Sequence, residues 1–132
     1  MGQPPWFLLH KIVDHFRRRE AVIELGNLDV ARDFSDVRSV AEAYLRLLQC
    51  CPAGKTFNIC SGKAHSLEQV LGIMEEIAGY RIEQRVNPNF VRSNEVKLLL
   101  GSPARLEAVI GPMEWIPLRE TLTWMLNADT PQ

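Results

Sequence analysis

Residues 26–40 read GNLDVARDFSDVRSV, and this stretch separates a short apolar segment from an amphipathic one. Gly26 and Asn27 are turn formers that follow the apolar residues 21–25, which we predict to form a strand. Asp36 precedes a run with helical spacing and is a favoured N-cap residue, so we predict a helix that begins there. A strand, a turn and a helix in succession are typical of an α/β chain.

The remainder of the chain alternates in the same way. Proline, glycine and a Ser66–Gln69 capping-box spacing mark the helix boundaries, and Gly79 can end the third helix. The predicted helices span residues 6–16, 36–50, 66–78 and 103–110, with a last one starting at 117, and the predicted strands span 21–25, 56–60, 81–86 and 96–100. The strand at 81–86 alternates, so we expect one buried face. We predict an α/β (α+β) fold, a small layered single domain over residues 1–132 with short strands and about five helices.

The charge balance and the short apolar stretches argue against nucleic acid and membranes as partners. With 15 basic and 16 acidic side chains the net charge is -1, which lacks the basic footprint typical of a nucleic-acid binder. The basic run at 17–19 either covers a solvated helix end or binds phosphate. No apolar stretch is long enough to span a bilayer, and the N-terminal residues do not show a basic segment followed by an apolar one with a cleavage site. We therefore expect a cytoplasmic protein with neither a nucleic-acid nor a membrane partner.

The cysteines show no spacing that indicates a metal site or a catalytic thiol. Cys50, Cys51 and Cys60 form an odd set without a Cys-x-x-Cys pair, and no histidine lies at ligand spacing from them. Two adjacent cysteines rarely bridge each other, because a disulfide needs more room than one peptide allows. We expect buried reduced thiols and no metal.

Motifs of catalysis and of dinucleotide binding are missing from the sequence. It contains no nucleophile elbow, no phosphate-binding Gly-x-x-x-x-Gly-Lys loop and no Gly-x-Gly-x-x-Gly, so we predict no catalytic and no cofactor-binding residues. Two charged pairs stand out. Arg32 and Asp33 are neighbours before a predicted helix, and Arg92 and Glu95 are three residues apart. Each pair is either a surface ion pair or a ligand site in which the guanidinium holds a phosphate or carboxylate.

Three blocks of sequence point to a known family. They read GNLDVARDFSDVRSVAEAY, TFNICSG and FVRSNEVKLLLGSPARLEAVIG, in this order. Together they resemble the C-terminal, substrate-binding half of extended short-chain dehydrogenase/reductases, the NAD-dependent epimerase/dehydratase family that acts on nucleotide sugars. The motifs GNLD-x-x-RDF and R-x-x-EV-x-LLLG are similar to those of the GDP-mannose 4,6-dehydratase and GDP-6-deoxy-4-keto-hexose reductase group. The resemblance covers nearly the whole chain.

This resemblance implies a ligand and a set of residues that bind it. Lys11, in a helical Phe-x-x-x-Lys, matches the family lysine that approaches the diphosphate. Arg32 matches the arginine that contacts the nucleotide, and the turn at Asn27 lies near the base. Arg92 and Glu95 match the arginine that binds diphosphate and the acid that binds the ribose hydroxyls. The implied ligand is a GDP-sugar or a related nucleotide sugar, and three cations with one carboxylate suit a diphosphate and a diol.

The resemblance also shows what the chain does not contain. The Rossmann half of the family, with its glycine-rich loop and its Tyr-x-x-x-Lys pair, has no counterpart here, and neither Tyr44 nor Tyr80 has a lysine four residues later. The parent family uses NAD(P), but we expect no cofactor in this chain and no activity of the chain alone. We expect a truncated product, an expressed fragment or one half of a split enzyme, with a separate Rossmann-half chain as a possible partner.

Three hypotheses for the function remain. In the family, the helix at 36–50 and the strand at 56–60 pack on the Rossmann half, so here Val37, Val40 and Tyr44 would be exposed unless something covers them. We therefore predict a homodimer that buries these faces. The chain is a catalytically incomplete nucleotide-sugar-binding domain, a protein-interaction or homodimerising module that has lost ligand binding, or an enzyme of another kind.

Overall fold

The computed structural model describes residues 7–50, 52–91 and 96–128. Within these ranges helices and short strands alternate along the chain, and the α/β class with five α-helices is confirmed. The elements are α1 (Leu8–Arg17), β1 (Val22–Leu25), β2 (Ala31–Asp33), α2 (Val37–Cys50), β3 (Ala64–Ser66), α3 (Leu67–Ala78), β4 (Glu83–Val86), the 3-10 helix η1 (Pro88–Phe90), β5 (Leu98–Leu99), α4 (Ala104–Ile110) and α5 (Leu118–Asn127).

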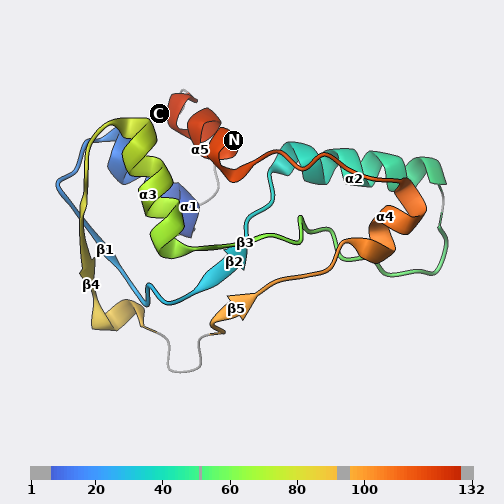
Figure 1. Ribbon diagram of the computed structural model, residues 1–132, viewed down its shortest axis with the longest axis horizontal. Coiled ribbons are helices and arrows are strands. Elements are labelled where there is room, and N and C mark those ends of the chain that lie inside the picture. The colour runs from blue at the N-terminus through green and yellow to red at the C-terminus, as the bar shows by residue number, and fades with distance from the viewer. Residues whose placement is uncertain (1–6, 51, 92–95, 129–132) are drawn as a thin grey trace.

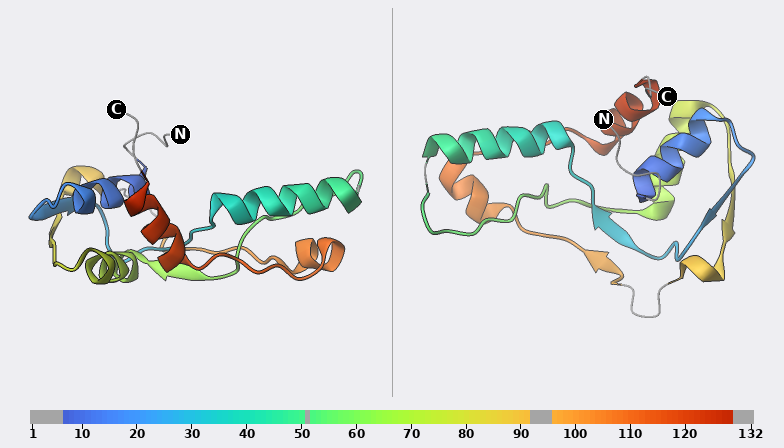
Figure 2. Two further views of the ribbon diagram at one scale, coloured as in Figure 1. Left: turned by 90° about the horizontal axis from the view of Figure 1, so that it is seen from above. Right: turned by 180° about the vertical axis from the view of Figure 1, so that it is seen from behind.

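The strands form two small sheets. β1 and β4 pair in parallel, and a three-stranded sheet has the order β3-β2-β5. In that second sheet β2 runs antiparallel to β3 and parallel to β5. Figure 1 shows α1, α3 and α5 gathered near β1 and β4 at one end of an elongated molecule, with α2 and α4 at the other end. The three-stranded sheet lies between the two groups of helices, and Figure 2 shows how thin the molecule is in the third direction.

Two strand predictions need correction. The predicted strand at 56–60 is not formed, because no strand among the described residues pairs with this segment. The strand at 81–86 forms as β4, but all four of its residues are exposed, contrary to the predicted buried face. β4 is the edge of a two-stranded sheet, where few neighbours cover the side chains. Only Ile82, just before the strand, enters the core.

The strands β2 and β3 were not predicted from the sequence. Each is three residues long, and neither ARD nor AHS has apolar alternation. β2 pairs with β3 on one side and with β5 on the other. Partners that lie so far apart in sequence cannot be inferred from a local pattern.

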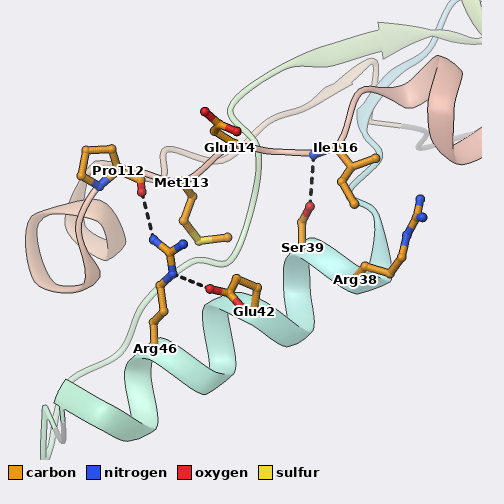
Figure 3. A pocket seen from close by; sticks show the side chains of 8 residues that line it. All are labelled: Arg38, Ser39, Glu42, Arg46, Pro112, Met113, Glu114 and Ile116. Atoms are coloured by element: carbon orange, nitrogen blue, oxygen red, sulfur yellow. Dashed lines mark hydrogen bonds and ion pairs between the residues drawn. The ribbon is translucent and has the colours of Figure 1, made fainter.

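Helix α2 is attached to the segment before α5 by two hydrogen-bonded side chains, Ser39 and Arg46 (Figure 3). The Ser39 hydroxyl accepts from the backbone N–H of Ile116 at 3.1 Å. Arg46 donates to the carbonyl of Pro112 at 3.0 Å and to the Glu42 carboxylate at 2.7 Å. Only small residues of this helix are buried, which allows the chain to approach it closely.

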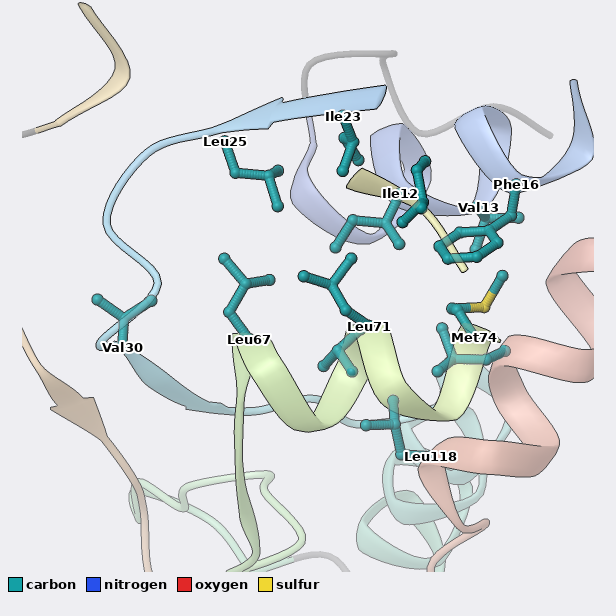
Figure 4. Packing of buried hydrophobic residues seen from close by; sticks show 13 residues of the cluster. Ile12, Val13, Phe16, Ile23, Leu25, Val30, Leu67, Leu71, Met74 and Leu118 are labelled. Atoms are coloured by element: carbon teal, nitrogen blue, oxygen red, sulfur yellow. The ribbon is translucent and has the colours of Figure 1, made fainter. Parts of the chain in front are cut away.

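The main core fills the space between α1, α3, α5 and β1 (Figure 4). Helix α3 is bounded as predicted, by the Ser66–Gln69 capping box and by Gly79 at φ 74°. Its residues at spacing i, i+3, i+4 and i+7 are buried, as expected for one face of a helix. The buried cluster consists of Ile12, Val13, Phe16, Ile23, Leu25, Val30, Leu67, Val70, Leu71, Met74, Ile82, Leu118 and Leu122.

A buried carboxylate joins α2 to α5. Asp36 is 1% exposed, and its Oδ1 accepts from the backbone N–H of Arg38 at 2.8 Å, as predicted for an N-cap. Its two oxygens also accept from the Arg38 guanidinium at 2.9 and 2.8 Å, and Oδ2 accepts from the Thr121 hydroxyl at 2.7 Å. The hydrogen bond from Arg38 is the main cause that lowers the pKa of Asp36 to about 2, against the opposing effect of burial.

We predict that Asp36→Asn lowers the free energy of unfolding by about 2 kcal/mol at neutral pH, which corresponds to the lowered pKa of the carboxyl group. Urea denaturation measures this loss. Glu83→Gln is the matched control, because Glu83 and Arg85 pair through side chains that are more than half exposed and such pairs contribute little.

The pH dependence tests the same interaction. The pKa of Asp36 is lower in the folded chain than in the unfolded chain, so its contribution is complete above about pH 4 and is lost as the pH falls toward about 2. The difference in unfolding free energy between wild type and Asp36→Asn should shrink over this range. A difference that stays constant down to the acid limit of folding would contradict the assignment.

Candidate functional site

Lys11 connects α1 to the end of β1. Its Nζ donates to the carbonyl of Glu24 at 2.5 Å and lies 4.4 Å from the centre of the Phe90 ring. A cation over an aromatic face is attracted by the ring electrons. Lys11 is thus held between the end of β1 and the last residue of η1. Phe90 had no role in the sequence prediction, although an aromatic residue within a polar turn could have drawn attention to it.

The backbone of Gly26 is in close contact with η1. A Cβ atom placed on Gly26 would lie 2.5 Å from the carbonyl oxygen of Phe90, so no larger residue fits without a shift. The Glu24 carboxylate accepts from the Asn87 side chain at 2.8 Å, and the backbone N–H of Asn87 donates to Leu25 at 2.8 Å. These contacts fix η1 against the turn that follows β1.

Asn27 forms the turn between β1 and β2. Its side-chain oxygen accepts from the backbone N–H of Asp29 at 3.0 Å, which is an Asx turn. Asp29 in turn pairs with Lys97 at 2.8 Å, and this hydrogen bond raises the pKa of Lys97. The turn predicted at 26–27 is therefore confirmed, and it is linked to the segment that leads into β5.

Arg32 lies in the centre of the three-stranded sheet. Its Nη1 donates to the carbonyl of Ala31 at 2.9 Å and to that of Lys97 at 3.3 Å. The same Lys97 carbonyl accepts from the backbone N–H of Ala31 at 2.7 Å. The guanidinium therefore leans toward the start of β5.

Three of the predicted ligand residues thus lie on or against one short piece of chain, residues 24–32. Lys11 contacts residue 24, Asn27 shapes the turn, and Arg32 follows on β2; together they form the candidate site. Residues on both sides of positions 92–95 contact the candidate site. Before them, the Phe90 ring of η1 lies under Lys11, and after them the carbonyl of Lys97 accepts from Arg32. The predicted residues Arg92 and Glu95 themselves lie outside the described residues.

Asp33 does not form a ligand pair with Arg32. Successive residues of a strand point to opposite faces. The Asp33 carboxylate accepts instead from the Ser61 hydroxyl at 2.7 Å and from the Gly62 N–H at 2.8 Å. Its role is to hold the turn at 61–62 against β2, so the interpretation of Arg32 and Asp33 as one site is corrected.

The cysteines differ from the prediction in one case. Cys60 is buried, and burial raises the pKa of its thiol, so it is poorly suited to act as a nucleophile. Cys50 is exposed, contrary to the expectation of a buried thiol, although its Sγ donates to the carbonyl of Val109 in α4 at 3.6 Å. Cys51 lies outside the described residues. Within the described ranges, no cluster of three or more His, Cys, Asp or Glu residues could hold a metal.

The basic run at 17–19 is partly used by the fold. Arg17 donates to the carbonyl of Met125 at 2.6 Å, near the end of α5, where a cation is favourable. Arg18 pairs with Asp14 at 3.0 Å. These partners favour the structural alternative over phosphate binding.

A pocket of about 440 Å³ lies between α2 and the segment before α5, away from the candidate site (Figure 3). Arg46 in its wall is engaged by Glu42 and Pro112, and Arg38 is engaged by Asp36. The cations of this pocket are therefore already paired. Its lining consists of Arg38, Ser39, Glu42, Arg46, Pro112, Met113, Glu114 and Ile116. Separately, none of the described helices has the length and apolar character needed to cross a membrane.

A match to a protein-family model shows to which family the chain belongs. The family described as GDP-mannose 4,6 dehydratase matches residues 6–125. The chain belongs to this family. It is 35% identical over 111 residues to the GDP-6-deoxy-D-talose 4-dehydrogenase of Aggregatibacter actinomycetemcomitans, covering 84% of this chain and 38% of that protein. It is also 35% identical to the GDP-6-deoxy-D-mannose reductase of Pseudomonas aeruginosa, covering 80% of this chain and 34% of that protein.

Solved structures of the epimerase/dehydratase class agree with this assignment. A crystal structure from Burkholderia cenocepacia is 51% identical, with a TM-score of 0.93 over 96% of this chain and 42% of that one. The structure of RMD from Pseudomonas aeruginosa complexed with NADPH is 31% identical, with a TM-score of 0.87 over 95% and 43%. This chain thus spans well under half the length of the relatives that it matches. The family resemblance drawn from the sequence is confirmed.

We predict that Gly26→Ala disturbs the candidate site, because the added methyl group meets the backbone of Phe90 rather than a movable side chain. The expected loss of unfolding free energy is about 1–3 kcal/mol. Gly72→Ala is the matched control. It lies within α3 with nothing within 4 Å of the added Cβ, so that variant should gain about 0.5–1 kcal/mol. Equal effects of the two substitutions in thermal unfolding would contradict the close contact.

Proposed function

We propose that the chain forms the part of a GDP-hexose dehydratase or reductase that binds the nucleotide sugar. The observation that carries this proposal is that Asn27 and Arg32 lie on residues 24–32 and that Lys11 of α1 contacts the start of this piece, in a member of a family whose named relatives act on GDP-sugars. Two cations supplied by different elements can offset the charge of a diphosphate.

Each residue has a separate role in this proposal. Lys11 binds a diphosphate oxygen as a point charge, and Arg32 presents a fork of donors to the nucleotide. The Asx turn at Asn27 positions the backbone near the base. Arg92 adds a third cation for the diphosphate, and Glu95 accepts from the ribose hydroxyls. These last two assignments rest on the sequence motif alone.

The proposed reaction chemistry needs a further part. A dehydratase or reductase of this kind transfers hydride through a nicotinamide cofactor, and this sequence has neither the glycine-rich loop nor the Tyr-x-x-x-Lys pair. We therefore propose that these residues bind the sugar nucleotide without transforming it, and that NAD(P) is held by a Rossmann half outside them.

We predict that millimolar GDP or GDP-mannose raises the Tm of the chain by several degrees, because a ligand that binds only the folded state stabilises it. Lys11→Ala and Arg32→Ala should each abolish the shift. Arg85→Ala is the matched control, since Arg85 is an exposed cation paired with Glu83 on β4, and it should retain the full shift. A folded wild-type chain whose Tm does not move in millimolar GDP would refute the proposal.

A second candidate function is protein association, and the exposed face of α2 favours it. Val37, Tyr44 and Leu48 follow one face of the helix with exposures of 62%, 58% and 74%. A contiguous apolar face of this kind is rare on the surface of a monomer. We propose that this face is buried in a homodimer, which leaves the candidate site open on a different part of the molecule.

We predict that the wild-type chain sediments as a dimer at concentrations on the order of tens of micromolar, and that Tyr44→Glu converts it to a monomer by placing a charge in the apolar contact. Val86→Glu is the matched control, because it adds the same charge at an exposed apolar residue of β4. A monomeric wild type, or equal dissociation by both variants, would argue against α2 as the interface.

A further inference from the structure

The ammonium group of Lys11 is held by two partners that carry no charge. Its Nζ donates to the backbone carbonyl of Glu24 at 2.5 Å and lies 4.4 Å from the centre of the Phe90 ring. Among the described residues, no carboxylate forms an ion pair with it, whereas the ammonium of Lys97 pairs with Asp29 at 2.8 Å. A carbonyl and an aromatic face attract a cation without cancelling its charge. Within the described part of the chain, Lys11 is thus a cation in a defined place that no acid neutralises.

Burial in the core does not explain the position of the Phe90 ring. Its side chain is 49% exposed, and it belongs neither to the buried cluster nor to the partly buried residues packed against that cluster. An apolar side chain that stays half in water gains less from the hydrophobic effect than a buried one. The contact with the Lys11 ammonium is the interaction that the structure gives this ring.

The backbone that carries the ring is fixed against the end of β1. The N–H of Asn87 donates to the carbonyl of Leu25 at 2.8 Å, and its side-chain amide donates to the Glu24 carboxylate at 2.8 Å. The N–H of Phe90 then donates to the carbonyl of Asn87 at 2.9 Å, and Gly26 lies against the Phe90 carbonyl with no room for a methyl group. The ring and the carbonyl that contact Lys11 are therefore tied to each other.

A lysine held in advance binds an anion more tightly than a free one. The long lysine side chain loses rotamer freedom when a ligand orders it, and this loss weakens binding. Partners that already order the side chain remove that cost. An ammonium group has three N–H donors. The Glu24 carbonyl takes one and the ring face at most one more, so one donor of Lys11 remains for an anion.

We propose that Phe90 is a positioning residue for Lys11: its ring holds the ammonium group in the place from which it binds a diphosphate oxygen. This inference rests on the proposed function and adds to it a residue that acts through Lys11. The competing role is direct stacking of the Phe90 ring on the base of the nucleotide. The two roles differ in one respect, because only the first requires the ammonium group.

The first test measures the Kd of GDP-mannose by isothermal titration calorimetry. Phe90→Leu keeps an apolar side chain without a ring face and should bind about two- to tenfold more weakly, the cost of ordering one long side chain. Phe90→Tyr keeps the ring face and should bind with the wild-type Kd. Trp124→Leu is the matched control, because Trp124 is 47% exposed and its ring lies 4.7 Å from the Arg38 guanidinium. It loses the same kind of contact between α5 and α2 and should also keep the wild-type Kd.

The second test separates positioning from stacking. In the Lys11→Met background, which lacks the ammonium group, Phe90→Leu should cause no further loss of affinity when the weak binding is followed by ligand-observed NMR. The ε-methylene protons of Lys11 give an independent signature in the free protein. Protons over an aromatic face resonate upfield, so this signal should move downfield in Phe90→Leu and stay upfield in Phe90→Tyr.

Circular dichroism confirms that each variant is folded. An unchanged Kd in Phe90→Leu, or a Phe90→Tyr variant as weak as Phe90→Leu, refutes the role of the ring while the proposed function stands. An equal loss with and without the ammonium group shows that Phe90 acts on the ligand itself and overturns positioning, as does an unmoved Lys11 signal. If the folded wild type binds no GDP-mannose, the proposed function fails and this inference fails with it.

Discussion

The buried carboxylate of Asp36 is the constraint on which the arrangement of the molecule depends. It begins α2 just after β2 and accepts from Thr121 of α5, so two helices distant in sequence meet at one side chain. A buried charge is costly unless its hydrogen bonds are complete. Here both oxygens are satisfied, and the Arg38 guanidinium that supplies two of the bonds also lies 4.7 Å from the Trp124 ring. The two helical ends of the molecule are thereby fixed to each other.

The sequence predicted the elements that local chemistry determines and missed those that distant partners determine. The capping box at Ser66 and the left-handed Gly79 fix α3 without reference to the remainder of the chain, and both were read correctly. The strand at residues 56–60 was predicted from composition, but a strand exists only where a neighbour shares its hydrogen bonds. β2 was missed for the opposite reason: it has no apolar pattern, and its partners β3 and β5 are far away along the chain.

The candidate site shows the same division. The family motifs identified Lys11, Asn27 and Arg32; Asn27 and Arg32 lie on residues 24–32, and Lys11 of α1 contacts Glu24 at the start of this segment. The reading of Arg32 and Asp33 as a pair failed because strand geometry turns them to opposite faces, where Asp33 holds the turn at Ser61. The pairing of Arg32 on β2 with His65 on β3 could not be predicted, because the sequence indicated neither strand.

The apolar face of α2 and the unpaired segment at 56–60 have a common cause. Val37 and Tyr44 are more than half exposed, and no strand among the described residues pairs with the segment at 56–60. A second copy that packs helix against helix removes Val37 and Tyr44 from water but leaves the backbone groups of the segment to solvent. A partner that brings both a packing surface and a strand satisfies both needs at once. The longer relatives, in which this length of chain is less than half of the whole, have enough additional chain to provide such a partner. A homodimer through α2 alone is therefore the smaller of two assemblies. The larger one contains a partner that also adds a strand, and only there does the segment at 56–60 gain a hydrogen-bonded neighbour. This segment therefore distinguishes the two assemblies.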